Sequence, residues 1–423
     1  MTSLVRFETP LSGDSHRWLA GLLVSSQAAE VSAAVIRVVG RGLDARAELL
    51  GDLSAEIPRD TAARLRPALE NGACTPAVLA NVRAQLAEVE AALLDDLLAK
   101  TGLTPDRVLA AGVHDPGLWT CTPGEPRGYL GWCDAARLAE LTSLNLVDAF
   151  PARDLAQGGL GGPLRALPEW LLLRDRRRNR VLLDLGRTTR MSYLPAQAAD
   201  RAAAGVRCFE VGPGTALLDL LAQRLSGGEH RFDPGGRMAA QGRRLGPLVD
   251  RWLLDPFFHS PLPRWHPRGV RPERYLTEAL QMAVASGWSV RDLLCTATHF
   301  LAETVSLALR KNLPSETAVD EIIVTGGGQH NGMLLHELGR LTAVPLLPIA
   351  QTAVTSEALG PASVALLAML YLDSIPGNLP AITGAETPRI LGRLTPGSPQ
   401  NWQRFLQSYA GAAPAVRPLR SAI

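Results

Sequence analysis

Three successive glycines, residues 326–328 of the segment EIIVTGGGQHNGMLLHELG, could bring a ligand close to the backbone. The apolar run at 322–324 is typical of a buried strand, and Leu334 and Leu338 recur at helical spacing after it. Backbone without side chains can pass close to a phosphate, and the following helix offers unpaired N–H groups and the positive end of its dipole. The pattern fits a nucleotide site, and it fits a tight packing turn equally well.

The lysine content limits how a phosphate could be held. Lys100 and Lys311 are the only lysines, and neither a Walker A loop nor the strand lysine of protein kinases is present. Any phosphate chemistry must therefore rest on backbone amides, arginine or a bound metal. No metal-ligand spacing stands out among the eight histidines, so we assign no protein residue as a metal ligand.

Composition predicts two domains and a cytoplasmic location. The 423 residues, 46% of them hydrophobic, exceed what one core usually supports. The net charge of +2 gives no electrostatic case for nucleic acid or a membrane, and we expect the arginine cluster at 174–180 to be a solvated turn. The five cysteines include no CxxC pair, which argues against a disulfide framework. Without a signal-peptide core or a run of ~18 apolar residues, we expect a soluble protein with no membrane partner.

Two predicted hairpins suggest a duplicated architecture. Residues 17–40 and 180–195 each have the pattern of a strand, a polar turn and a second strand. Apolar spacing predicts an amphipathic helix over 76–101. Ser289, with Asp292 three residues later, predicts the capped start of another helix, which leads to the glycine corner. From the hairpin patterns at 17–40 and 180–195, we expect each half of the chain to begin with a hairpin.

From FPARDLAQGGLGGPL at residues 150–164, the chain resembles the 1,6-anhydro-N-acetylmuramic acid kinases, a family of the actin, Hsp70 and sugar-kinase superfamily. Further similar segments follow in the family order. They are FEVGPGTALLD at 209–219, RMAAQGR at 237–243, DPFF at 255–258, VTGGGQHN at 324–331, SEALGPASVALLA at 356–368 and GNLPAITGAETPRILG at 377–392.

The resemblance implies an α/β fold of two actin-like, ribonuclease H-like domains with a central cleft. It also implies a kinase that uses ATP and Mg²⁺, opens the 1,6-anhydro bridge with water and phosphorylates the released O6, in cell-wall recycling. The partners would be a small amino sugar and ATP, and a homodimer is left open. Domain I would cover residues 1–170 and domain II residues 171–385, while 386–423 would return to domain I.

The resemblance also assigns roles to single residues. Asp154 matches the aspartate that activates the water, so it is the candidate general base; for an aspartate considered alone, a helix or loop cap is the alternative. Asp219 would be either a ligand or a cap or buried ion pair. The implied sugar-binding residues are His114, Arg153, Gly158 and Gly159. The implied nucleotide-binding residues are Ser25, Ser26, Gly186, Arg187, Gly212, Gly214, Gly326, Gly327, Gly328 and Asn331.

The first phosphate hairpin departs from the family pattern. The family reads close to GLMSGTSLDGID, whereas residues 21–32 read GLLVSSQAAEVS and place Ala29 where the first aspartate stands. An alanine cannot orient a magnesium-bound water, and Glu30, one place along, would point to the other face of the strand.

Two further segments depart from the family near the expected site. The second turn reads DLGRTTR in place of NIGGIAN, so Arg187 and Arg190 would either bind phosphate or fill the pocket. A family KSTG segment aligns with Arg264 to His266. Because each lost phosphate donor costs about a hundredfold or more, the alternative to an active kinase is a pseudokinase that binds nucleotide, amino sugar or a protein partner.

Overall fold

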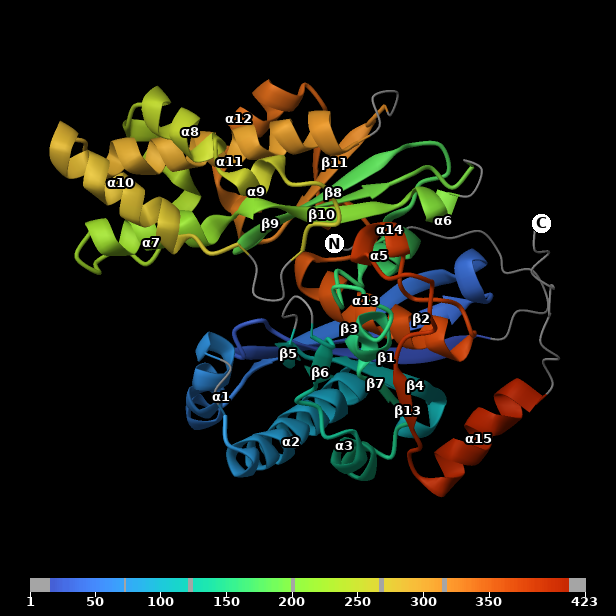
Figure 1. The fold of residues 1–423 in the computed structure, drawn as a ribbon. Coiled ribbons are helices and arrows are strands. Elements are labelled where there is room, and N and C mark those ends of the chain that lie inside the picture. Colours follow the sequence, from blue (N-terminus) through green and yellow to red (C-terminus); the bar gives the residue numbers. More distant parts are fainter. Residues whose placement is uncertain are drawn as a thin grey trace.

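Two large β-sheets organise the chain (Figure 1). The computed structural model describes residues 16–71, 74–120, 125–198, 202–265, 270–313 and 318–410. The first sheet has the strand order β13-β7-β4-β1-β2-β3 and the second has the order β10-β9-β8-β11-β12. A two-stranded sheet of β5 (Leu118–Thr120) and β6 (Gly128–Leu130) accompanies them.

The strands of the first sheet are β1 (Arg17–Val24), β2 (Glu30–Val39), β3 (Arg46–Glu56), β4 (Val108–His114), β7 (Leu146–Asp148) and β13 (Arg393–Thr395). Those of the second are β8 (Arg180–Leu185), β9 (Thr188–Leu194), β10 (Arg207–Pro213), β11 (Glu321–Thr325) and β12 (Leu346–Pro348). Each sheet begins with a three-stranded antiparallel meander, and two parallel strands are then added beside the first strand of that meander. This repeated topology confirms both predicted hairpins and the predicted two-domain, actin-like α/β fold.

Helices form three layers around the two sheets (Figure 1). The outer layer of the first sheet comprises α1 (Arg59–Asn71), α2 (Pro76–Thr101) and α3 (Ala135–Thr142). The layer between the sheets comprises α5 (Ala166–Leu173) and α13 (Ser356–Leu372). The outer layer of the second sheet comprises α7 (Thr215–Leu225), α8 (Gly246–Leu253), α10 (Glu273–Ser286), α11 (Val290–Asn312) and α12 (Gly332–Thr342). The remaining helices are α4 (Phe150–Leu155), α6 (Ala202–Gly205), α9 (Pro256–His259), α14 (Pro380–Thr383) and α15 (Pro399–Ala410).

Residues at one end of each predicted helix determine where that helix ends or begins. Helix α2 ends where Gly102 adopts the left-handed conformation with φ 68°, which a glycine takes without strain. Helix α11 begins with a capping box, in which the Ser289 and Asp292 side chains each accept the other residue's backbone N–H. Both helix predictions are therefore confirmed.

Helix α13 corrects the predicted path of the chain. We expected the return to domain I at residue 386, but α13 already lies against β1 and β4. A Cβ at Gly112 would stand 2.5 Å from the Val364 carbonyl oxygen, so the helix crosses β4 at a place where only glycine fits. Because α13 is apolar on all sides, it is suited to this buried layer. The predicted domain II range of 171–385 thus includes a helix of the first domain's core.

The arginine cluster at 174–180 forms the predicted turn. The Asp175 carboxylate accepts backbone N–H groups from Arg177 and Arg178, and both Arg178 and Arg180 pair with Glu321.

Within the described ranges, no helix combines the length and the apolar content that a membrane crossing requires.

Candidate functional site

The predicted site residues follow the carboxyl ends of parallel strands, where ligands bind in open α/β sheets. In the first domain, the Ser25–Glu30 turn follows β1, His114 ends β4, and α4 with Asp154 follows β7. In the second, Gly186 follows β8 and the three glycines follow β11. The fold therefore brings segments from distant parts of the chain to corresponding edges of the two sheets.

The glycines of the second domain converge closely. Thr215 donates its backbone N–H to the Gly186 carbonyl at 2.8 Å, and Gly214 donates to the Arg187 carbonyl at 2.9 Å. A Cβ at Gly326 would stand 2.7 Å from the Gly186 nitrogen, and one at Gly328 would stand 2.7 Å from Leu185 Cβ. Three separate glycine elements thus pack backbone to backbone, and Gly327 between them has open space beside its Cα. Such exposed backbone can approach a phosphate.

Two predicted nucleotide residues have visible structural roles. Gly212 lies inside β10, where a Cβ would stand 2.9 Å from the Phe258 ring. Asn331 caps α12, since its Oδ1 accepts the Leu334 N–H at 3.0 Å, and it is buried. Gly212 is therefore explained by close packing, and Asn331 holds the start of the helix that follows the glycine corner.

The first hairpin turn closes on itself. Ser25 Oγ accepts the backbone N–H groups of Ala29 and Glu30, each at 3.1 Å, and the Ser25 carbonyl accepts the N–H of Ala28. The Glu30 carboxylate accepts the Ser32 hydroxyl at 2.9 Å. The side chain of Ser25 thus occupies amides that a phosphate-binding turn would offer to its ligand.

Gln27 and Arg187 join the two hairpin turns. With its amide oriented so that the oxygen faces the guanidinium, Gln27 accepts from Arg187 Nη2 at 3.0 Å and Nε at 2.7 Å. Both side chains are exposed, as is Ser26 beside Gln27. Arg187 therefore stands at the meeting point of the two domains, where its guanidinium could hold a phosphate.

Asp154 is fully buried and its carboxylate is held from three sides. Oδ1 accepts from Asn378 Nδ2 at 2.6 Å and from Thr383 Oγ1 at 2.7 Å, while Oδ2 accepts the Gly161 N–H at 2.8 Å. Gly159 lies against this carboxylate, because a Cβ there would overlap Oδ2. These contacts fix the orientation of the carboxylate, as a general base requires.

The other predicted sugar residues surround the turn that follows Asp154. The Arg127 guanidinium donates to the carbonyl oxygens of Gly158 and Gly159, so an arginine outside the predicted set holds this turn. Gly158 adopts φ 74°, which favours glycine. Arg153 is exposed on α4. The structure therefore places Gly158 and Gly159 at Asp154 and leaves Arg153 on the surface beside them.

The charge of Arg165 acts on His114, the last residue of β4. Burial, and then the charge of Arg165, lower the pKa of His114 to about 4, so the imidazole is neutral at pH 7. Burial and the charge of Arg190 also lower the pKa of Arg165, while the charges of Glu169 and Asp184 oppose that shift. The sequence prediction missed Arg165. Its signal was an arginine directly after the 150–164 segment, in a chain with almost no lysine.

Arg190 of β9 is buried against Glu169 of α5, in the layer between the two sheets. Its guanidinium donates to both oxygens of Glu169, at 2.6 and 2.8 Å, and Ser192 donates to Glu169 at 2.9 Å. Burial would raise the pKa of Glu169, but the charge and hydrogen bonds of Arg190 lower it below its usual value. Of the two alternatives for Arg190, the structure supports the filled pocket, which leaves Arg187 as the phosphate-binding candidate.

Two carboxylates lie near the converging glycines. Asp184 is 3.4 Å from Arg190, and its Oδ1 is 2.7 Å from where a Cβ of Gly326 would stand. Asp219 on α7 has its pKa raised to about 6 by burial, against the charge of Arg187. Among the described residues no group of three or more His, Cys, Asp or Glu could hold a metal ion alone. One or two carboxylates beside phosphates are nevertheless the usual protein share of a kinase Mg²⁺ site.

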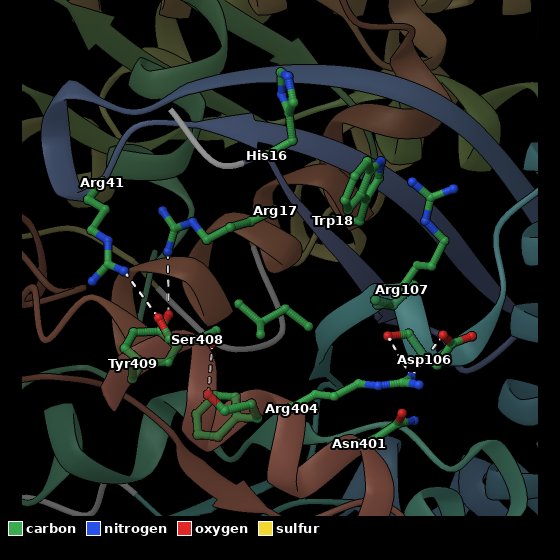
Figure 2. Close-up of a pocket in the computed structure, with 13 residues that line it drawn as sticks. His16, Arg17, Trp18, Arg41, Asp106, Arg107, Asn401, Arg404, Ser408 and Tyr409 are labelled. Atoms are coloured by element: carbon green, nitrogen blue, oxygen red, sulfur yellow. Dashed lines mark hydrogen bonds and ion pairs between the residues drawn. The ribbon is translucent and has the colours of Figure 1, made fainter. Parts of the chain in front are cut away.

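A separate cavity of about 220 Å³ lies at the opposite ends of β1 and β4, against α15 (Figure 2). Its charged groups already have partners. Arg17 pairs with Asp373 at 2.5 Å, Arg404 pairs with Asp106 at 2.8 Å, and the Arg107 guanidinium lies 4.7 Å from the ring centre of Trp18. The cavity is lined by none of the predicted site residues, so we place it outside the candidate site.

Comparison with known proteins agrees with the resemblance that the sequence motifs indicate. A protein named anhydro-N-acetylmuramic acid kinase from Acaryochloris marina is 32% identical over 387 residues, which cover 88% of this chain and 98% of that protein. One of the same name from Salinibacter ruber is 30% identical over 91% of this chain and 98% of its own length. One from Synechococcus elongatus is 37% identical over 62% of this chain and 68% of its own length.

A solved ROK family glucokinase from Streptomyces griseus, in complex with glucose and AMPPNP, aligns with a TM-score of 0.38 and 13% identity over 83% of this chain and 98% of that one. The curated relatives above are all named as kinases, so they give no support to the pseudokinase alternative. The family model described as anhydro-N-acetylmuramic acid kinase matches residues 21–397. The chain therefore belongs to the anhydro-N-acetylmuramic acid kinase family.

Proposed function

We propose that this protein opens the bridge of 1,6-anhydro-N-acetylmuramic acid with water and phosphorylates the released O6 from ATP. The observation that carries the proposal is the buried Asp154 carboxylate, oriented by Gly161, Asn378 and Thr383. Family membership supports the choice of substrate, and the convergence of Gly186, Gly214 and the 326–328 segment supports a nucleotide site there. Cell-wall recycling in the cytoplasm is the corresponding role.

In this proposal Asp154 takes a proton from a water molecule whose oxygen bonds to C1 of the sugar. The C1–O6 bond breaks, O6 forms a bond to the γ-phosphorus, and ADP leaves with the electrons of the broken P–O bond. The product is heavier than the sugar by one water and one phosphoryl group. Positioning and charge neutralisation are the main demands of such a transfer. His114, neutral at pH 7, and the turn at Gly158 and Gly159 would line the sugar site.

The nucleotide would lie on the second domain. Arg187 would face its phosphates, since the chain offers no lysine there. Asp184 and Asp219 would hold Mg²⁺ together with phosphate oxygens, and the ion would neutralise charge on the transferred group. Ser25 and Ser26 would contribute less, because Ser25 Oγ already accepts two amides of its own turn.

The test is mass spectrometry of a reaction that contains the protein, magnesium-ATP and 1,6-anhydro-N-acetylmuramic acid. We expect the phosphorylated, hydrated sugar, and a decrease in turnover of about a hundredfold to ten-thousandfold in Asp154→Asn. Asp373→Asn is the matched control. Asp373 is also a buried carboxylate, bound by the Gly42 N–H and by Arg17 at the start of β1, the end of that strand opposite the Ser25–Glu30 turn.

We expect Asp373→Asn to lower stability while the folded protein keeps its turnover. Unchanged sugar at high wild-type concentration would reject the proposed function and revive the pseudokinase alternative. Equal turnover in Asp154→Asn and wild type would reject Asp154 as the base.

A further inference from the structure

A short strap from the second domain touches both segments that hold the Asp154 carboxylate. We define the strap as residues 262–265. A Cβ at Gly162, next to the donor Gly161, would stand 2.6 Å from Cζ2 of Trp265. A Cβ at Gly384, next to the donor Thr383, would stand 3.0 Å from Cγ of Pro263. A Cβ at Gly162 would overlap the Trp265 ring, and one at Gly384 would press on Pro263, so the strap packs tightly on both segments.

The strap is fixed to the edge strand of the second sheet. Glu210 of β10 donates its N–H to the Arg264 carbonyl at 3.0 Å, and Arg264 Nε donates back to the Glu210 carbonyl at 2.8 Å. The Arg264 guanidinium also lies 4.8 Å from the ring centre of Phe257 and 5.6 Å from that of Phe209. Arg264 is buried. The strap therefore moves with the nucleotide domain.

Trp265 meets aromatic side chains of the sugar domain. Its ring centre is 5.3 Å from that of Trp119, and Trp119 in turn is 5.2 Å from Tyr129. The Trp119 ring lies against Gly161, where a Cβ would overlap it. The turn after Asp154 is thus held between a tryptophan of its own domain and a tryptophan of the other domain. Aromatic pairs at these separations attract each other beyond the effect of the apolar area that they bury.

The turn needs such support, because its own backbone is permissive. Gly158 and Gly161 both adopt positive φ, at 74° and 75°, and glycine visits many other conformations at little cost. Arg127 holds Gly158 and Gly159, and Leu160 donates its N–H to the Thr383 carbonyl, so these contacts fix the first part of the turn. The Trp265 contact at Gly162 supports the other end, where the Gly161 N–H reaches Asp154 Oδ2.

We propose that Trp265 is a positioning residue that couples docking of the nucleotide domain on the sugar domain to the orientation of Asp154. This inference rests on the proposed function. Its consequence is that the base is aligned only when the two domains are closed, which would restrict water activation to the complete complex.

The first experiment is hydrogen–deuterium exchange of the full-length protein, read in peptides that cover 155–165. We expect faster exchange at these residues in Trp265→Ala and near wild-type exchange in Trp265→Phe, which keeps an aromatic ring on Gly162. Trp288→Ala is the matched control, because Trp288 is a partly buried tryptophan of the same domain outside the strap. Exchange in Trp265→Ala equal to wild type would overturn the proposal.

The second experiment measures turnover with 1,6-anhydro-N-acetylmuramic acid. We expect kcat of Trp265→Ala to fall between about tenfold and a hundredfold, since small misplacements of a catalytic group have effects of this size. The KM for ATP should stay within about twofold of wild type, because the strap does not touch the glycines of the nucleotide site. A change in KM for ATP alone, or full activity in the alanine variant, would contradict the positioning role.

The two experiments separate this inference from the proposed function. If the wild-type protein does not phosphorylate the sugar, the function fails, and the exchange measurement still decides whether Trp265 holds the turn. If Trp265→Ala does not fold, Trp265→Leu replaces it, because leucine keeps an apolar contact without the ring. Wild-type exchange and kcat in Trp265→Leu would equally overturn the proposal.

Discussion

The two hairpin turns, Ser25–Glu30 and Gly186–Arg187, occupy equivalent places in the two sheets but differ in chemistry. In the first, Ser25 accepts the amides of Ala29 and Glu30, so the turn satisfies itself. In the second, the backbone packs against two further glycine elements, and Arg187 projects outward. The strand pairing of a hairpin does not depend on a ligand-binding turn, so one copy can lose its chemistry while the fold persists. We therefore expect the second hairpin to carry most of the phosphate binding.

Among changes in the two turns, loss of the Arg187 charge should have the largest effect. We expect Arg187→Met to lower kcat/KM for ATP by about a hundredfold, because one donor to a transferred phosphate is worth that much. Steady-state kinetics with varied ATP measures it. Gln27→Leu removes the other end of the Gln27–Arg187 contact and should lower the same constant less than tenfold. Equal losses in both variants would show that the contact matters and the charge does not.

Restoring a carboxylate to the first turn should have a moderate effect in the other direction. Ala29 is exposed, so Ala29→Asp places a carboxylate where the family pattern has one without repacking the core. We expect the Mg²⁺ concentration for half-maximal turnover to fall about threefold, as one added hydrogen bond to a metal-bound water would give. Ala29→Asn is the uncharged control. A higher Mg²⁺ requirement in Ala29→Asp would show that the first turn lies outside the phosphate site.

The smallest effect concerns Asp219 beside Arg187. Burial raises its pKa from 3.8 to about 6 in the folded protein, so charging this carboxylate costs folding free energy. The stability that the protonated Asp219 carboxyl contributes is therefore complete below pH 4, and it is lost as this group ionises while the pH rises to about 6. Relative to wild type, Asp219→Asn should gain at most about 1 kcal/mol in free energy of unfolding between pH 4 and pH 7, after solvent screening.

Urea unfolding at several pH values measures this gain. The same measurement in an Arg187→Met background tests the effect of the Arg187 charge on it. Since the charge of Arg187 opposes the shift, the gain from Asp219→Asn should be larger in the Arg187→Met background. A gain in unfolding free energy that shrinks as the pH rises would contradict the raised pKa of Asp219. A gain of the same size with and without Arg187 would contradict the opposing effect of the Arg187 charge.

Local signals were sufficient to predict much of the fold and part of the site. The hairpins follow from apolar strands with polar turns, and the ends of α2 and α11 follow from Gly102 and the Ser289–Asp292 pair. The 326–328 glycines were identified from the strand and helix patterns around them and the other glycine elements by resemblance, and their convergence agrees with both. Each of these features is encoded within a few residues of chain, which is why the pattern of the sequence reveals it.

Contacts between distant segments could not be predicted in this way. Asp154 is held by Asn378 and Thr383, more than two hundred residues away. Glu169 holds the Arg190 guanidinium in an ion pair away from the phosphate site, and no residue near Arg190 in the sequence predicts that pair. The contact of Trp265 with Gly162 likewise requires the arrangement of both domains. Tertiary packing decides such pairings, so a single sequence leaves them open.

The late position of α13 in the chain has a consequence for biosynthesis. As the protein leaves the ribosome, β1 to β4 are made early, but the helix that covers their inner face is residues 356–372. The nascent first domain would therefore expose one apolar face of its sheet until the whole second domain had been synthesised. Domains usually fold in order from the N-terminus. Here the N-terminal domain must wait, and its strands stay uncovered until residues 356–372 have been made.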